Sequence, residues 1–291
     1  MLGQNIGRGM FLTVVAMLFV AGMDATGKFL TQTYPIVEIM AIRFAIFFAI
    51  AVIATARKGQ LRSVRSKLAG LQIFRSLILV VEVSVFIYAF SLMPLADAHS
   101  IAAVAPLIAT LMAGLFLGEV IGVRRWISVT IGLIGALIII RPGLGVMSWH
   151  ALIPLFGAVL WAAYQVLSRR VSQADTPETT VMYTAVVGLV IFGALAPFNW
   201  VTPTTEGWLW LILNGVLGSI GHYILIKALD LAPASTLQPF SYALLLWAIA
   251  IGFFAFGDLP DALTFVGAAI VVGAGILSSD SGRAIIARFR R

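Results

Sequence analysis

The stretch AFSLMP at residues 89–94 is matched by ALDLAP at residues 228–233, with the closing prolines 139 positions apart (94 to 233). The same offset pairs GE at 118–119 with GD at 257–258. Each half of the chain holds about five apolar segments of membrane length, roughly 20 residues each. Because five is odd, the second unit should run upside down relative to the first. Inverted repeats recur in secondary transporters, where the two halves exchange roles around a midplane site.

The composition is that of a membrane protein built almost entirely from membrane-spanning segments. Hydrophobic residues make up 61% and charged residues 11% of the 291 positions, whereas soluble domains are about 25% charged. Ten spans of about 20 residues leave only short loops, with no room for a soluble catalytic domain. Cysteine is absent, which excludes disulfides, thiol catalysis and cysteine-based metal sites.

We therefore predict an all-α polytopic membrane protein with ten transmembrane helices. They are expected to form two inverted five-helix repeats, residues 1–145 and 146–291. Proline and glycine turns separate the apolar segments. The predicted spans are 10–32, 36–56, 70–92, 97–117, 125–141, 149–169, 179–198, 208–229, 235–256 and 262–279.

The basic residues predict the orientation. With the N-terminus inside, 16 of the 19 Lys and Arg residues fall on the cytoplasmic side, leaving Lys28, Arg43 and Arg141. This bias places both termini in the cytoplasm. The net charge of +7 is thus explained by loops, and nucleic-acid binding is not expected. Arg75, near the inner surface, is expected to snorkel toward the headgroups.

Ionisable residues inside a span are functional candidates because they cost a few kcal/mol or more there. Glu82 is the sharpest, near the middle of the span 70–92. It is predicted to pair with a substrate amine or to carry a proton; the alternative is a structural ion pair or a protonated, hydrogen-bonded acid between helices. His222 follows a stripe of small residues and either contacts substrate or packs as a hydrogen-bonded core residue.

Three further charges lie in the first two spans. Asp24 and Lys28 are four residues apart, which permits an ion pair within one helix; Lys28 alternatively snorkels outward. Arg43 either attracts a substrate carboxylate or bonds to backbone carbonyls.

The offset of 139 residues makes His99 and Gln238 equivalent. They follow turns at opposite mouths of the predicted pathway, which fits two gates of an alternating-access cycle. Polar residues are also common where a helix starts after a turn, so this ordinary explanation stays open.

Aromatic side chains at membrane depth are candidates for stacking on planar substrates or holding cations. At any one position, lipid contact or packing is the alternative. The candidates are Phe86, Tyr88, Trp161, Tyr164 and Trp247.

Small residues recur at helical spacing in the span 125–141, at Ser128, Gly132 and Ala136, and in the last span at Gly267 and Gly275. Such faces let helices approach closely. They either pack within one chain or form a homodimer contact.

The order of these motifs resembles the drug/metabolite transporter superfamily, specifically ten-helix exporters with two EamA-type domains. The chain looks most like the aromatic amino-acid and drug exporters of the YddG type. The first unit carries YAF at 88–90, Pro94, LGE at 117–119, Trp126 and RPG at 141–143; the second carries KAL at 227–229, Pro233, Pro239 and GD at 257–258, with Asp258 where Glu is common. The resemblance covers nearly the whole chain. It implies a central cavity lined by the first four helices of each repeat, with the fifth and tenth at the periphery, in the bacterial inner membrane.

The sequence therefore favours a secondary transporter that exports amino acids, including aromatic ones, or related small metabolites by alternating access. Exporters of toxic cationic compounds or nucleotide-derived metabolites on the same fold are the close alternative, and a membrane sensor or scaffold without flux is a remote one. An enzyme is not expected. The three His residues are scattered, and no metal-binding His pair or phosphate-binding loop is present. No metal or cofactor is predicted; the expected partners are a small-molecule substrate and the lipid bilayer.

Overall fold

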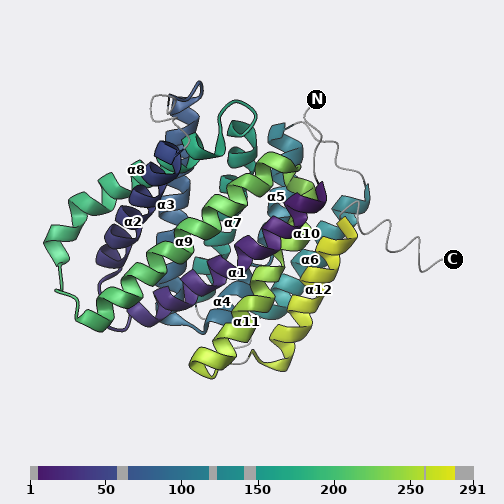
Figure 1. Ribbon diagram of the computed structural model, residues 1–291. Helices are drawn as coiled ribbons and strands as arrows, with labels where there is room; N and C mark the ends of the chain where they lie inside the picture. The colour runs from purple at the N-terminus through teal and green to yellow at the C-terminus, as the bar shows by residue number, and fades with distance from the viewer. Residues whose placement is uncertain (1–5, 58–64, 118–122, 141–148, 259, 279–291) are drawn as a thin grey trace.

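The computed structural model describes residues 6–57, 65–117, 123–140, 149–258 and 260–278. In these ranges the chain folds into helices joined by short turns and contains no strand (Figure 1). The α-helices are α1 (Ile6–Leu30), α2 (Ile36–Arg57), α3 (Ala69–Leu92), α4 (Leu95–Ala102), α5 (Ala105–Leu117), α6 (Val123–Ile140), α7 (Leu152–Val171), α8 (Pro177–Leu195), α9 (Thr205–Leu231), α10 (Ala234–Ser241), α11 (Ala243–Phe256) and α12 (Ala262–Ser278). Two short 3₁₀ turns, η2 (Trp149–Ala151) and η3 (Ala196–Asn199), precede α7 and follow α8.

Among the described residues, 7 helical stretches are long and apolar enough to cross a membrane. They begin with Ile6–Leu30 and end with Thr205–Leu231, and two shorter apolar helices, Ala243–Phe256 and Ala262–Ala274, follow them. The chain is thus an all-α polytopic membrane protein.

Threonine and proline start several of these helices. Thr176 accepts a hydrogen bond from the Thr179 N–H at 3.3 Å, just before Pro177 in the first turn of α8. Thr204 accepts one from the Gly207 N–H at 3.0 Å at the start of α9. These side chains satisfy N–H groups that have no partner inside the helix.

Two of the predicted spans, 97–117 and 235–256, are each built from two helices with a break between them. The first breaks at Ala103 and Val104, between α4 and α5, and the second at Tyr242, between α10 and α11. Pro106 accounts for the first break, because it lacks an N–H and its ring crowds the carbonyl four residues back. Ala103 and Tyr242 are themselves 139 positions apart.

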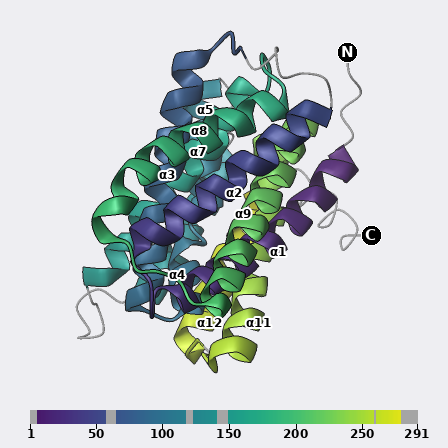
Figure 2. The ribbon, with the colours of Figure 1, turned by 60° about the vertical axis from the view of Figure 1, so that its left-hand side comes forward.

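The helix contacts pair up between the two halves of the chain. In Figures 1 and 2, α1 lies beside α9, and α3 likewise packs on α7. The contact of α1 with α11 has its counterpart in the contact of α5 with α7. The two broken spans also contact each other, because α4 packs on α11 and α5 packs on α10. α2 with α8 and α6 with α12 form the two opposite ends of the molecule (Figure 1).

The small-residue face of α6 packs against α12 in the same chain. A Cβ added at Gly135 would lie 2.8 Å from the Gly267 carbonyl oxygen, and one at Gly132 would lie 3.6 Å from the Ala274 Cβ. The close approach therefore serves packing within the protomer. The side chains of Ser128 and Ala136, and the packing at Gly275, lie outside what the structure describes.

We expect Gly135→Ala to lower the thermal stability of the purified protein in detergent, because the added methyl group meets a backbone carbonyl that cannot move aside. Overpacking of this kind costs about 1–3 kcal/mol. Gly273→Ala on α12 is the matched control, since a Cβ there has no neighbour within 4 Å. Equal melting temperatures for the two variants would contradict the close α6–α12 contact.

Candidate functional site

A cavity lies where the two broken helices meet. Its wall includes Ala103 and Pro106 beside the first break and Ser241, Tyr242 and Leu244 beside the second. Side chains from α1, α3, α7 and α9 complete the lining. The space open to water-sized molecules is about 60 Å³, enough for a few waters. Discontinuous helices around a midplane cavity are typical of transporter substrate sites.

Six residues singled out from the sequence meet in this cavity. They come from α1, α3, α4, α7 and α9, and all six contribute to the lining: Asp24, Glu82, Phe86, His99, Trp161 and His222.

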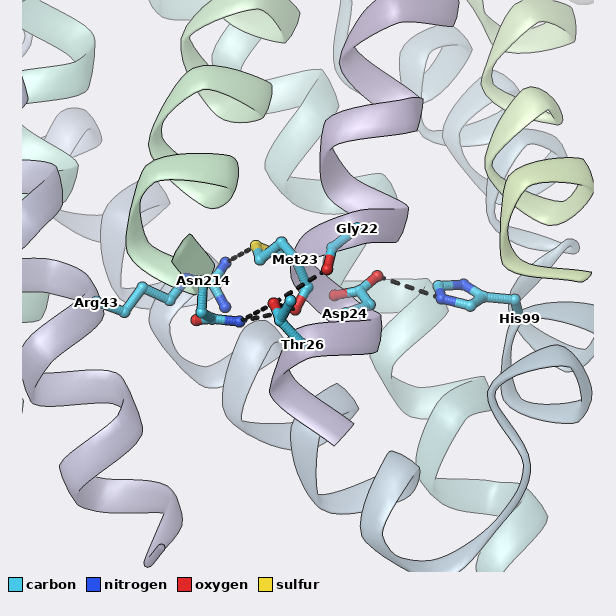
Figure 3. Close-up of polar contacts among 7 residues, drawn as sticks. All are labelled: Gly22, Met23, Asp24, Thr26, Arg43, His99 and Asn214. Atoms are coloured by element: carbon cyan, nitrogen blue, oxygen red, sulfur yellow. Dashed lines mark hydrogen bonds and ion pairs between the residues drawn. The ribbon is translucent and has the colours of Figure 1, made fainter. Parts of the chain in front are cut away.

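Asp24 and His99 tie α1 to α4. The distance between Asp24 Oδ2 and His99 Nε2 is 3.2 Å, and both side chains are buried. Figure 3 shows the Asp24 side chain reaching from α1 toward His99, away from Arg43. An ion pair between Asp24 and Lys28 within α1 is therefore not formed. Lys28 instead donates to Asp258 at 2.7 Å and lies 4.8 Å from the Phe256 ring centroid.

The opposite face of α1 contacts α2 and α9. Arg43 donates to the Met23 sulfur, and the Asn214 amide donates to the Met23 carbonyl at 2.7 Å and to Thr26 Oγ1 at 2.9 Å (Figure 3). Arg43 itself is buried behind Met23 and interacts electrostatically with Asp24 and Glu82. Arg43 therefore offsets part of the negative charge of Asp24 and Glu82, although Arg43 itself does not line the cavity.

Glu82 is the acidic group left free for a ligand. It is buried, it lines the cavity, and within the described part of the chain it makes no hydrogen bond and no close ion pair. A buried carboxylate without such partners is costly. A bound donor or cation in the cavity would supply the missing interaction.

Aromatic rings surround the two histidines. Phe86 stacks on His99 with ring centroids 6.0 Å apart and an interplanar angle of 16°. Trp161 and Tyr164 meet the His222 ring edge-on at 6.0 and 6.1 Å. These rings give the cavity flat apolar walls on which a planar molecule can stack.

The other predicted residues lie behind or outside the cavity. Tyr164 is fully buried behind Trp161, and Gln238 donates to the Gln165 side chain at 3.2 Å. Trp247 is partly buried and packs on the core without lining the cavity. Tyr88 is 49% exposed and lines a separate apolar groove with Leu77 and Val81, away from the cavity.

Sequence reasoning missed several polar residues, and it placed Arg75 wrongly. Arg75 does not snorkel: it is completely buried and donates to Ser168 at 3.2 Å, to the Thr180 carbonyl at 2.9 Å and to Thr184 at 2.5 Å. This network joins α3, α7 and α8. Asn214, Ser241 and Tyr242 were also missed. Uncharged polar residues are less costly in an apolar span than ionisable ones, so they do not stand out in the sequence. Glu119, the equivalent of Asp258, lies outside the described residues.

Among known proteins, a riboflavin transporter of Vibrio cholerae is 29% identical over 240 residues, covering 82% of this chain and 80% of the relative. An S-adenosylmethionine uptake transporter of Rickettsia bellii is 25% identical over 270 residues, covering 93% and 92%. A pseudopaline exporter of Pseudomonas aeruginosa is 27% identical over 273 residues, covering 93% and 95%. A solved crystal structure superposes with a TM-score of 0.73 at 20% identity, covering 96% of this chain and 99% of that one, which shows a shared fold.

The profile of the EamA-like transporter family matches the chain twice, over residues 7–141 and 147–279. The two matches together span most of the chain, and the relatives named above are transporters rather than enzymes. The chain therefore belongs to the EamA-like transporter family of the drug/metabolite transporter superfamily.

Proposed function

We propose that this protein is a secondary transporter that carries a small metabolite with a planar aromatic group across the bacterial inner membrane by alternating access. The observation that carries the proposal is the cavity at the two helix breaks, whose wall contains Glu82 together with Phe86 and Trp161. The membership in a transporter family supports it.

Two inverted repeats, residues 1–145 and 146–291, would supply the alternating access. Their support is the paired helix contacts, the helix breaks 139 positions apart and the double match to one family. In such an arrangement each half can adopt the conformation of the other, which moves the opening from one side of the membrane to the other.

The cavity chemistry suits a flat molecule that carries both hydrogen-bond donors and apolar ring faces. Glu82 would accept from an N–H or O–H group, while Phe86 and Trp161 would stack on the ring. Riboflavin is the first candidate because it meets these requirements and a 29% identical relative is named a riboflavin transporter. With about 60 Å³ open to water-sized molecules, the cavity would have to widen to load such a molecule.

Aromatic amino acids, predicted from the sequence, are the second candidate. Their ammonium group would pair with Glu82 and their ring would use the same walls. The substrates named for the relatives are riboflavin, S-adenosylmethionine and pseudopaline, which is why riboflavin takes precedence.

The gates would lie on either side of the cavity. On the outer side, with both termini cytoplasmic, Asp24–His99 and Lys28–Asp258 hold α1 against α4 and against the turn after α11. On the inner side, the Gln238–Gln165 hydrogen bond holds α10 against α7.

We expect purified protein in liposomes to take up radiolabelled riboflavin with saturation, and lumichrome, which shares the ring, to compete. The same vesicles should be tested with tryptophan and S-adenosylmethionine, with and without a pH gradient. Uptake of tryptophan alone would favour the amino-acid alternative. If none of the three compounds enters the vesicles faster than into protein-free liposomes, the proposed substrate class is wrong.

A further inference from the structure

Three polar side chains in the cavity wall near the second helix break have no hydrogen-bond partner among the described residues. Ser241 and Tyr242 precede α11, and His222 lies on α9 beside them in the cavity wall. They are 6%, 4% and 2% exposed, respectively. Among the described residues, neither hydroxyl and neither imidazole nitrogen has a hydrogen-bond partner. Nearly all buried polar atoms in proteins are paired, so this cluster points to a ligand.

All three side chains can donate a hydrogen bond. A serine hydroxyl, a tyrosine hydroxyl and a neutral imidazole can each present one hydrogen to an acceptor. None of them is restricted by a competing hydrogen bond within the described residues. Together they could hold one oxygen atom or a pair of neighbouring oxygens.

The backbone at this point favours the same ligand chemistry. α11 begins immediately after Tyr242, and Leu244 and Leu245 in its first turn line the cavity. The Leu245 and Leu246 N–H groups both return to the Tyr242 carbonyl. The N-terminus of a helix carries a partial positive charge that attracts anions and acceptor oxygens.

The cavity is therefore polarised. Its first-half wall presents the carboxylates of Asp24 and Glu82, which accept when ionised, and its second-half wall presents the donors of Ser241, Tyr242 and His222. A molecule with a donor or cation at one end and an acceptor oxygen at the other satisfies both walls. A purely cationic or purely apolar compound leaves the second wall unpaired.

We propose that Ser241, Tyr242 and His222, with the N-terminus of α11, form a subsite for an acceptor oxygen of the substrate, either a ring carbonyl or a carboxylate. This inference rests on the proposed function and specifies which end of the substrate each wall binds. It also gives the specificity rule: the transporter selects metabolites that carry such an oxygen over analogues that lack it.

Equilibrium binding to the detergent-purified protein tests the subsite with two pairs of probes. Lumichrome and phenazine are both flat tricyclic rings, but only lumichrome has carbonyl oxygens. Tryptophan and tryptamine differ by one carboxylate. The wild-type protein should bind the oxygen-bearing member of at least one pair about tenfold more tightly, and the pair that shows the preference identifies the oxygen as carbonyl or carboxylate.

The double variant Ser241→Ala with Tyr242→Phe should abolish that preference. It should weaken the oxygen-bearing probe about tenfold and leave its partner unchanged. Tyr88→Phe, outside the cavity, is the matched control, and Ser241→Ala alone provides a milder variant if the double one melts early. Equal weakening of both members, or a preference that survives in the double variant, would overturn the subsite alone. Failure of the wild-type protein to bind any of the four probes would overturn the proposed substrate class and the subsite with it.

Discussion

Glu82→Gln should lower substrate uptake roughly ten- to hundredfold at low substrate concentration, without unfolding the protein. Glu82 lines the cavity with no hydrogen bond to described residues, so its interaction energy is available to the substrate. A hydrogen bond to a charged group contributes about 1.5–3 kcal/mol, and each 1.4 kcal/mol is about a factor of ten in binding. Glutamine keeps the size of the side chain and removes the charge.

The measurement is initial uptake in proteoliposomes at substrate levels below saturation, together with the melting temperature. Glu206→Gln at the start of α9 is the matched control, because Glu206 is exposed and lies outside the cavity. We expect the control to transport like the wild type. Undiminished uptake by Glu82→Gln would remove the proposed role of this carboxylate.

Much of the fold follows from the hydrophobic pattern and the repeat. Continuous apolar segments of about 20 residues predict helices, because in the bilayer a helix satisfies every backbone group within the segment itself. The helix breaks did not follow from that pattern, since both Ala103 and Tyr242 lie inside segments whose average apolarity predicts a membrane span. Pro106 and Pro239 were visible, but a proline inside a span does not reveal whether the helix kinks, breaks or continues.

The residues of the candidate site could also be predicted only in part. Asp24, Glu82, His99 and His222 were found because charge and histidine are costly in an apolar span. Their partners were not found, because contacts such as Asp24–His99 and Lys28–Asp258 join residues 75 and 230 positions apart in the chain. Helical periodicity reports only neighbours three or four residues away, which is why it suggested the incorrect Asp24–Lys28 pair.

The outer gate gives the second large effect, and the absence of cysteine makes it measurable. Ala103 lines the cavity, and Ala103→Cys would be the single thiol in the chain. With the proposed outer gate closed by Asp24–His99 and Lys28–Asp258, a membrane-impermeant maleimide applied from outside intact cells should label it slowly. Lys28→Met removes a partly exposed ion pair worth up to about 1 kcal/mol, so labelling should become up to roughly fivefold faster.

Asp24→Asn should have the larger effect, about tenfold or more in labelling rate, because it removes a buried carboxylate whose Oδ2 lies 3.2 Å from His99 Nε2, and a polar contact to a charged group contributes about 1.5–3 kcal/mol. For the Lys28–Asp258 pair, the double variant Lys28→Asp with Asp258→Lys should restore slow labelling, because it rebuilds the same ion pair with the two charges exchanged. Arg65→Met, an exposed cation outside the cavity and far in the chain from α1, controls for the loss of positive charge. Labelling rates that do not change in Lys28→Met and Asp24→Asn would show that these contacts do not close the pathway. Faster labelling only when the reagent is applied to inverted vesicles would place the gate on the cytoplasmic side. The swapped variant matters most, because only a gate held by the charge pair itself closes again when both charges are reversed.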